Sequence, residues 1–279
     1  MNKAIQLNAV NLDLDQVQVM GIINVTPDSF SDGGQFANFE RALKQVELMV
    51  ENGVDIIDIG GESTRPGALD VSEKDEIARV IPLLKAIKSR FDIKVSIDTS
   101  KAAVMSEAIS YDADMINDVR ALQNEGCVDV IAQSDVDVCL MHMQGMPRTM
   151  QENPQYKNII DDIVAFFAAR IDCCQKKNIS KERLILDPGF GFGKTLEHNY
   201  QMLAQFSLFK QLDLPLLAGI SRKSMLGNLL SRDVEQRLAG SLAAAIVAVQ
   251  QGASIIRVHD VAESVDALKV LKAVSQYNS

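Results

Sequence analysis

The segment "GVDIID" at residues 53–58 carries the pattern that decides the fold, and the pattern recurs twice in the chain. "DADMIN" at 112–117 and "GASIIR" at 252–257 share its order: a helix ends, Gly or Asp turns the chain, apolar residues follow, and a polar residue closes the run. We interpret each segment as the entry into a buried strand. Aligning the three segments places three polar residues at equivalent positions near strand C-termini: Asp58, Asn117 and Arg257.

Runs of the same kind extend along the whole chain and alternate with amphipathic stretches. The runs are short and rich in Ile, Val and Leu, as expected of parallel strands that are buried on both faces. The predicted strands are Val17–Asn24, Asp55–Ile59, Lys94–Asp98, Met115–Asn117, Val138–Met141, Arg183–Asp187, Leu216–Ile220 and Ser254–Val258. The predicted helices are one around Phe39–Val50 and those at 73–90, 100–111, 124–134, 155–178, 197–212, 233–251 and 261–276.

Eight strand–helix units in 279 residues predict an α/β fold of the closed (β/α)₈ TIM barrel type. No linker or low-complexity stretch divides the chain, so residues 1–279 are expected to form a single domain. An open doubly wound sheet is the alternative. It usually has fewer strands and a GxGxxG turn after the first one, and this chain has neither feature.

Composition excludes several classes of function. The net charge of −9 and the pI of about 4.9 disfavour nonspecific binding to nucleic acid or to an anionic membrane. No apolar run approaches the roughly 18 residues of a membrane span, and the N-terminus has no signal-peptide layout. The four cysteines contain no CxxC pair, which predicts free thiols in a cytoplasmic protein.

Polar residues stand at nearly every predicted strand end. One such residue could simply cap a helix, but burying many of them without partners would cost about 1–3 kcal/mol for each unsatisfied group. The carboxyl ends of the strands of a barrel meet at one mouth, so we expect an active site there. The residues concerned are Asn24, Asp58, Asp98, Asn117, His142, Asp187, Ser221, Arg222, Lys223, Arg257 and His259.

Charge divides these residues into two expected subsites. The first, on the neighbouring strands 8, 1 and 2, is rich in donors and suits a phosphate-like anion; it comprises Asn24, Thr64, Arg65, Arg257 and His259. The second offers mainly acceptors and suits a flat heterocycle with ring N–H and amino donors; it comprises Asp98, Asn117 and Asp187. Pairing of the acids with Lys223 or another nearby cation is the structural alternative.

Two further patterns are weaker. "GFGFGKT" at 189–195 resembles a phosphate-binding loop, but Pro188 stands where a Walker A loop requires its first Gly. Three acids near one mouth could bind a metal, yet they lack the spacing of a dedicated site, so a substrate-carried Mg²⁺ is expected instead. His198 is interpreted as a surface helix residue, and His142 is left open between a structural and a functional role.

Eight motifs, in order, are similar to those of the dihydropteroate synthase family of pterin-binding barrels, from about residue 19 to 275. They are "MGIINVTPDSFSDGG", "DIIDIGGESTRPGA", "VSIDTSK", "MINDVRAL", "LMHMQGMPRTMQ", "LILDPGFGFGK", "GISRKSMLG" and "GSLAAAIVAVQQGASIIRVHDV". The chain departs from the family pattern at Ala102, where Pro is frequent, and at Asp112, where Gly is common. Both positions are expected to lie away from the proposed site, the second at a turn where Asp tolerates a positive φ fairly well, so neither departure changes the expected function.

The resemblance implies a transferase of folate biosynthesis. Such an enzyme joins 7,8-dihydropterin-6-ylmethyl diphosphate to 4-aminobenzoate, with Mg²⁺, and is a target of sulfonamides. By motif, Asp98, Asn117, Asp187 and Lys223 would contact the pterin, Asn24 the metal, and Thr64, Arg65, Arg257 and His259 the diphosphate. Phe30, Pro66 and Ser221 would border the aminobenzoate, and the family is typically a homodimer.

Two residues of the first loop complete the expectations. Asp32 is a candidate to stabilise a cation-like pterin methylene, and Phe30 would cover the aminobenzoate ring when the loop closes, unless it simply packs on the barrel rim. With Asp32, the expected catalytic set is Arg65, Lys223, Arg257 and His259. The alternatives are a pterin-dependent methyltransferase, which would not need loops of this form, and a noncatalytic pterin-binding relative, which would have lost loop residues.

Overall fold

The computed structural model describes residues 14–25, 35–63, 70–145 and 149–277, with the side chains of 35–37 left aside. Eight parallel strands form its centre. They are β1 (Gln18–Asn24), β2 (Ile56–Gly60), β3 (Lys94–Asp98), β4 (Met115–Asp118), β5 (Asp137–Met141), β6 (Leu184–Asp187), β7 (Leu217–Ala218) and β8 (Ile255–Val258). Their order in the sheet is β6-β5-β4-β3-β2-β1-β8-β7.

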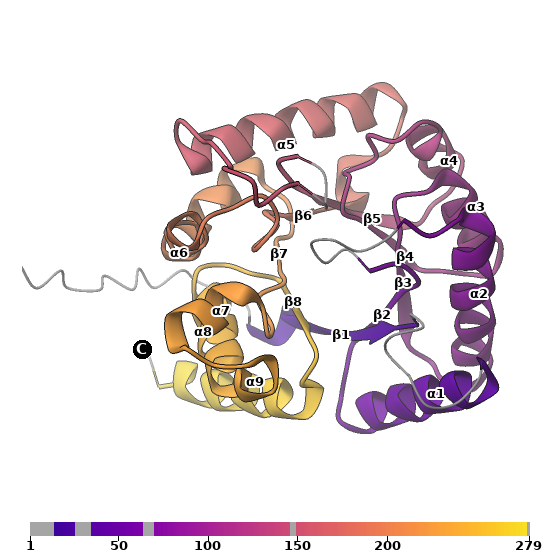
Figure 1. Cartoon of the computed structure of the whole chain (residues 1–279), viewed down its shortest axis with the longest axis horizontal. Helices are drawn as coiled ribbons and strands as arrows, with labels where there is room; N and C mark the ends of the chain where they lie inside the picture. The colour runs from indigo at the N-terminus through magenta and orange to yellow at the C-terminus, as the bar shows by residue number, and fades with distance from the viewer. Residues whose placement is uncertain (1–13, 26–34, 64–69, 146–148, 278–279) are drawn as a thin grey trace, which may run out of the picture.

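A parallel bridge between Leu186 and Leu216 joins the two outer strands of this order, so the sheet closes on itself. Figure 1 shows the strands as a central ring with the helices around it. The predicted (β/α)₈ barrel is confirmed, and strands β8, β1 and β2 are neighbours as expected.

The helices cover the barrel because each buries one apolar face against the strands. They are α1 (Gln35–Glu51), α2 (Glu73–Arg90), α3 (Ala102–Ser110), α4 (Cys127–Ala132), α5 (Ile159–Lys176), α6 (Leu196–Ala204), α7 (Ser224–Leu230), α8 (Leu238–Gln250) and α9 (Val261–Ser275). A large core lies between strands and helices, and a second, smaller cluster takes one residue from almost every strand. None of the helices formed by the described residues is long and apolar enough to span a membrane.

Several helix boundaries differ from the prediction for identifiable reasons. Helix α5 begins at Ile159 rather than near 155, because the Asn158 side chain accepts hydrogen bonds from two backbone N–H groups of the first turn. The segment predicted as one helix at 197–212 divides into α6 and a 3₁₀ turn at Phe206–Leu212. Strand β7 is shorter than predicted, with only Leu217–Ala218 in the ladder.

Helix α7 was not predicted, because its sequence is short and contains Gly227. The structure explains that glycine. A Cβ on Gly227 would lie 2.2–2.5 Å from three atoms of the Arg237 guanidinium group, so a side chain here would displace that group from its hydrogen bonds to the carbonyls of Arg222 and Arg232.

Alternation along the strands carries polar side chains into the mouth. Side chains two residues apart on a strand point to the same face. Met20, Ile56, Met115 and Ile255 belong to the small inner cluster, and the polar residues Asp58, Asn117 and Arg257 follow the last three of them by two positions. The inside of the barrel therefore changes from apolar to polar toward the C-terminal ends of the strands.

Two smaller predictions are also confirmed. Asp112 adopts a positive φ of 61°, at the turn where the sequence suggested it. The four cysteines, Cys127, Cys139, Cys173 and Cys174, are all free thiols.

Candidate active site

The three equivalent residues of the sequence repeat meet at one carboxylate. Asp58 is fully buried, and its Oδ2 accepts a hydrogen bond from Nε of Arg257 at 2.6 Å and one from Nδ2 of Asn117 at 3.2 Å. The same guanidinium reaches Oδ2 of Asp98 through Nη2 at 2.7 Å. Arg257 thus bridges two acids on adjacent strands, and Asn117 shares one of them.

Burial controls the ionisation of this cluster. It raises the pKa of Asp98 to about 7, against the opposing attraction of Arg257, and the neighbouring Asp58 adds to the rise. Burial alone would lower the pKa of the Arg257 guanidinium, but Asp58 and Asp98 together raise it above its ordinary value. Among the described residues, Oδ1 of Asp58 has no hydrogen-bond partner, so the mouth holds an acceptor that is available to a ligand.

A second carboxylate, Asp187, lies with Lys223 on the other side of the mouth. Oδ1 of Asp187 accepts a hydrogen bond from the backbone N–H of Gly189 at 2.7 Å. Lys223 donates to the carbonyl of Phe190, and its ammonium lies 4.5 Å from the centre of the Phe192 ring. Burial raises the pKa of Asp187, whereas it lowers the pKa of Lys223 to about 8.

Gly219 leaves space between these two groups. A Cβ on this residue would lie 3.8 Å from Nζ of Lys223 and 3.9 Å from both Oδ2 of Asp187 and Cβ of Arg257. Asp187, Lys223 and Arg257 therefore surround one point on the inner wall of the barrel.

The exits of strands β7 and β8 are joined by a side-chain contact. Oγ of Ser221 and Nδ1 of His259 lie 3.0 Å apart, and the backbone N–H of His259 donates to Oγ of Ser221 at 3.2 Å. On the exit of β1, Oδ1 of Asn24 lies 3.1 Å from where a Cβ on Gly60 would stand, and Asp98 lies just beyond at 3.9 Å. Asn24 is thus close to the acid cluster.

Arg257 has partners that its grouping in the sequence did not anticipate. The sequence grouped Arg257 with the anion-binding residues and apart from the acids, but the structure pairs its guanidinium with Asp58 and Asp98. The physical reason is that β8 and β2 both lie beside β1 in the closed ring, so a long side chain on β8 reaches across to β2 and β3. The pairing of the acids with a local cation, raised as an alternative, is therefore present for Asp98.

Several expected site residues lie outside the described part of the chain: Phe30, Asp32, Thr64, Arg65 and Pro66. Within the described part, no group of three or more His, Cys, Asp or Glu side chains is arranged to hold a metal ion. The remaining candidates all stand at the C-terminal ends of barrel strands, where the sequence placed them: Asn24, Asp98, Asn117, Asp187, Ser221, Lys223, Arg257 and His259.

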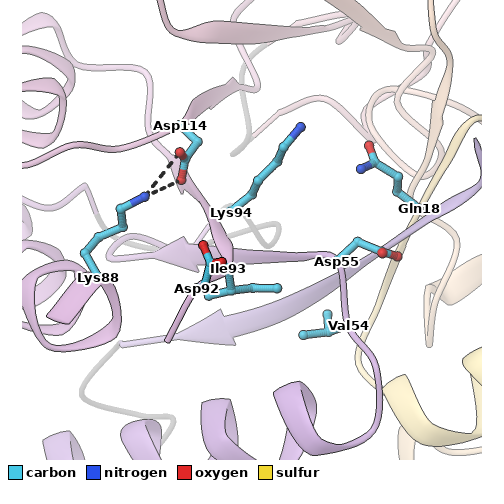
Figure 2. A pocket seen from close by; sticks show the side chains of 8 residues that line it. All are labelled: Gln18, Val54, Asp55, Lys88, Asp92, Ile93, Lys94 and Asp114. Carbon is cyan, nitrogen blue, oxygen red and sulfur yellow. Dashed lines mark hydrogen bonds and ion pairs between the residues drawn. The ribbon is translucent and has the colours of Figure 1, made fainter. Parts of the chain in front are cut away.

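The opposite end of the barrel has a polar hollow of its own, of about 300 Å³. Figure 2 shows Asp55, Lys94 and Gln18 around it, together with the ion pair between Lys88 and Asp114. Asp55, one of the acids that line this hollow, accepts a hydrogen bond from the backbone N–H of Val19 on the neighbouring strand at 2.7 Å. The acids that line the hollow therefore help to hold neighbouring strands together, and the candidate site lies at the opposite end of the barrel.

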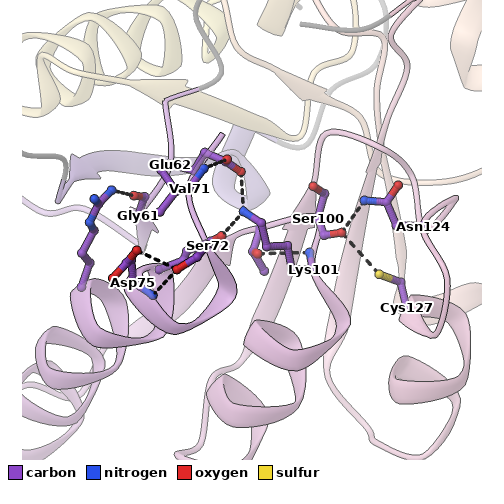
Figure 3. A network of polar contacts seen from close by, with 12 residues as sticks. Gly61, Glu62, Val71, Ser72, Asp75, Ser100, Lys101, Asn124 and Cys127 are labelled. Atoms are coloured by element: carbon purple, nitrogen blue, oxygen red, sulfur yellow. Dashed lines mark hydrogen bonds and ion pairs between the residues drawn. The ribbon is translucent and has the colours of Figure 1, made fainter. Parts of the chain in front are cut away.

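A buried ion-pair network near the mouth was not predicted. Nζ of Lys101 contacts Oε2 of Glu62 at 2.7 Å and Oε2 of Glu76 at 2.5 Å, and Glu76 is fully buried. Glu62 also accepts the backbone N–H of Val71 at 2.8 Å (Figure 3). Lys101 follows the end of β3 by three residues, which could have indicated a place near the mouth. Its partners Glu76 and Glu62 are 25 and 39 positions away in the sequence, so the pairing itself was not predictable.

The two uncertain histidines have structural surroundings. His198 completes a capping box with Thr195 at the start of α6, which agrees with its interpretation as a helix residue. His142 is buried, and its Nδ1 lies 3.0 Å from Nζ of the buried Lys194. Burial, helped by Lys194, lowers the pKa of His142 to about 2, so the imidazole is neutral.

Comparison with known proteins identifies the family. The sequence model of the family described as "Pterin binding enzyme" matches residues 20–259. The chain is 53% identical to the dihydropteroate synthase of Haemophilus influenzae, over 95% of this chain and 96% of the relative. A crystal structure of Yersinia pestis dihydropteroate synthase in a sulfonamide drug complex is 51% identical, with a TM-score of 0.90, and covers 96% of this chain and 98% of that one.

A third relative has been solved with a pterin product. The structure of Xanthomonas albilineans dihydropteroate synthase in complex with 7,8-dihydropteroate is 43% identical, with a TM-score of 0.86, and covers 95% of both chains. High identity over nearly the whole length, in sequence and in fold, leads to one assignment. This chain belongs to the pterin-binding enzymes, as a member of the dihydropteroate synthase family.

Proposed function

We propose that this chain joins 7,8-dihydropterin-6-ylmethyl diphosphate to 4-aminobenzoate, giving 7,8-dihydropteroate and pyrophosphate. The observation that carries the proposal is the cluster at the mouth, where Arg257 bridges Asp58 and Asp98 beside Asn117. A cluster that combines buried acceptors with a cation suits a substrate that has a donor-bearing ring at one end and an anion at the other.

The pterin half of the proposal assigns the ring to the acids. Asp98, Asn117 and Asp187 would accept hydrogen bonds from ring N–H and amino groups, and Lys223 would donate to a ring acceptor. Asn117 and Asp187 are buried, and desolvation raises the pKa of both Asp98 and Asp187. This supports the role, because a desolvated carboxylate interacts strongly with a fixed donor. The unpartnered Oδ1 of Asp58 adds a further acceptor at the same depth.

We propose that Arg257 and His259 bind the diphosphate. Thr64 and Arg65, which lie outside the described part of the chain, are proposed to contribute as well. Asn24 is the proposed protein ligand of a Mg²⁺ carried by the substrate. Magnesium is usually bound by a few protein oxygens together with substrate phosphates, and the amide oxygen of Asn24 near Asp98 fits that donor set. When bound, the ion would offset charge on the diphosphate.

The mechanism that we propose is dissociative. The C–O bond between the pterin methylene and the diphosphate breaks first, and the diphosphate leaves with the electron pair. The amine nitrogen of 4-aminobenzoate then bonds to the methylene carbon and releases a proton. Carboxylates around the ring would favour its cationic state, Asp32 is the candidate to stabilise the methylene directly, and Arg65, Arg257 and His259 would stabilise the leaving anion.

This mechanism needs no nucleophilic side chain and no strong general base, since the attacking aromatic amine is already neutral at pH 7. The aminobenzoate would be bordered by Ser221, together with Phe30 and Pro66 from outside the described residues. The contact of Ser221 with His259 supports a second substrate that lies beside the diphosphate half, as an attack on the methylene requires.

Two broader properties complete the proposal. We infer a homodimer, as the resemblance implies; the small residues Ala244, Ala245 and Ala248 of α8 pack inside the chain, while Ala239 and Ala243 are exposed on its outer side. We also infer a cytoplasmic location, which the four free thiols and the acidic composition support.

One assay tests the proposed activity. Purified protein is incubated with the pterin diphosphate, 4-aminobenzoate and Mg²⁺, and both pyrophosphate and dihydropteroate are measured. Equal amounts of the two products are expected. Pterin binding without either product would contradict the proposal and favour a noncatalytic relative, while methyl transfer from a methylated folate would favour a methyltransferase.

A further inference from the structure

Lys194 is a buried lysine whose ammonium contacts no carboxylate among its hydrogen-bond partners. Its side chain is 2% exposed, and it ends the "GFGFGK" segment that follows β6. Nζ lies 2.9 Å from the carbonyl of Phe192, 3.3 Å from the carbonyl of His142 and 3.0 Å from Nδ1 of His142. These three acceptors surround Nζ, and burial lowers the pKa of Lys194 well below its ordinary value. The side chain joins the exits of two strands through the N–H groups that it donates.

His142 supplies two of these acceptors and is itself held by aromatic rings. Its ring meets that of Phe166 edge to face at 4.9 Å and that of Tyr156 at 6.0 Å. A neutral imidazole presents one acceptor nitrogen, and the nitrogen that faces Lys194 is Nδ1. His142 therefore belongs to the wall behind the mouth as the partner of Lys194.

The backbone of the 189–194 segment lies against the exit of β5 with no room between them. A Cβ on Gly189 would stand 2.0 Å from the carbonyl oxygen of His142, and one on Gly193 would stand 2.3 Å from that of Gln144. Both glycines have positive φ angles, of 73° and 61°. Tyr156 adds a hydrogen bond from its hydroxyl to the carbonyl of Gly193 at 2.8 Å.

The same segment forms the surroundings of Lys223. The carbonyl of Phe190 accepts a hydrogen bond from Nζ of Lys223, and the Phe192 ring lies under that ammonium at 4.5 Å. At its start the segment is fixed by the hydrogen bond from Gly189 N–H to Asp187, and at its end by Lys194. Lys194 thus holds the strip of chain that sets where the ammonium of Lys223 stands.

We propose that Lys194 is a positioning residue for pterin binding, which acts by fixing Phe190 and Phe192 so that Lys223 is held beside Asp187. The inference rests on the proposed function and deepens it, since it assigns a role to the "GFGFGK" segment and to His142. In this role Lys194 does not itself contact the substrate. A purely structural role would instead make Lys194 important for folding and irrelevant to pterin affinity.

The test compares two lysine substitutions in the full-length protein. Lys194→Met removes the nitrogen and all of its N–H donors while keeping an unbranched apolar stem. Lys101→Met is the matched control, because Lys101 is also a largely buried lysine near the mouth but is paired with Glu62 and Glu76 and contacts other segments. Thermal unfolding reports stability, and calorimetry with 6-hydroxymethyl-7,8-dihydropterin, which lacks the diphosphate, reports pterin affinity alone.

We expect Lys194→Met to weaken dihydropterin binding at least tenfold and to raise the KM for the pterin diphosphate more than that for 4-aminobenzoate. Lys101→Met should lower the melting temperature and leave dihydropterin affinity within twofold. Lys194→Gln, which keeps donors for the two carbonyls, should recover part of the affinity, and it decides the question if the Met variant does not fold.

Two results would overturn the proposal. The first is a folded Lys194→Met, or failing that Lys194→Gln, with wild-type dihydropterin affinity. The second is an equal loss of affinity in Lys101→Met, which would assign the effect to general destabilisation. A failure of the proposed synthase function is separate, because it would appear as absent product in a wild-type protein that still binds dihydropterin.

Discussion

Asp55 directly precedes β2, Asp58 is the third of its five residues with its side chain toward the mouth, and the two have opposite surroundings. Asp55 is exposed at the N-terminal end of the barrel, and its carboxylate accepts a backbone N–H from the neighbouring strand. Asp58 is fully buried at the other end and pairs with the side chains of Arg257 and Asn117. The same residue type therefore binds a backbone N–H just before the strand and binds side chains at the mouth of the barrel.

The second copy of the repeat makes the same distinction. Asp114 accepts the backbone N–H of Val95 at 2.7 Å, as Asp55 does for Val19, whereas Asn117 faces Asp58. In the segments at 53–58 and 112–117, the residue at the third position accepts a backbone N–H of a neighbouring strand. The residue at the sixth position contributes its side chain to the mouth. The acids at the N-terminal ends of the strands therefore contribute to stability, while those that face the mouth are proposed to bind substrate, including Asp187 with its backbone partner Gly189.

Removal of the cation at the mouth should have the largest effect. In Arg257→Leu the buried Asp58 and Asp98 lose their shared partner, so we expect the free energy of unfolding to fall by about 3–5 kcal/mol and product formation to cease. Chemical denaturation monitored by circular dichroism measures the loss. Arg257→Lys keeps a charge but not the bridging geometry and should lose less stability. A loss below about 1 kcal/mol in Arg257→Leu would mean that the bridge is unimportant.

Next in size is the effect of Asp187→Asn on binding. The substitution removes a charged acceptor that would face the donors of the pterin, and affinity should fall by more than about 2 kcal/mol, which is roughly thirtyfold. Calorimetry with dihydropterin measures this loss, and the melting temperature of the variant serves as control. Unchanged affinity would remove Asp187 from the pterin site.

At the other end of the barrel, Asp114→Ala should change stability without changing binding. The variant leaves the N–H of Val95 without its acceptor and should cost about 1–2 kcal/mol of unfolding free energy. The KM values for both substrates should stay within twofold of wild type. A change in KM with little change in stability would break the distinction between the two ends.

The smallest effect concerns pH. Because the pKa of Asp98 is raised to about 7, its carboxyl is mostly protonated below that pH and mostly ionised above it. Dihydropterin affinity should therefore rise several-fold, by less than tenfold, as the pH increases from about 6 to about 8. The same raised pKa stabilises the fold at low pH, and this contribution is lost as the pH rises through about 7.

Asp98→Asn is the control for this titration, since the amide cannot ionise. We expect the pH dependence of affinity to disappear in this variant. If wild type and variant showed the same dependence, another group would be responsible for it.

The sequence was most informative where a residue's place on a strand determines its direction. Asp98, Asn117 and Asp187 end buried strands, and strand alternation alone sends them into the mouth. It was least informative for long side chains whose partners come from distant segments. The bridge from Arg257 to two acids, the Glu62–Lys101–Glu76 network and the contact of Lys194 with His142 all depend on how the ring closes. Helix α7 was missed because Gly227 lowers helix propensity. In the structure this glycine lies against the guanidinium of Arg237, a contact that the sequence does not reveal.

The most direct measurement is a calorimetric titration of dihydropterin into Asp55→Asn and Asp58→Asn, two isosteric changes three residues apart in the chain. The account predicts at least a tenfold loss of affinity for Asp58→Asn, because a buried carboxylate of the mouth loses its charge, and a change within twofold for Asp55→Asn. Equal affinities in the two variants, or a larger loss in Asp55→Asn, would contradict it.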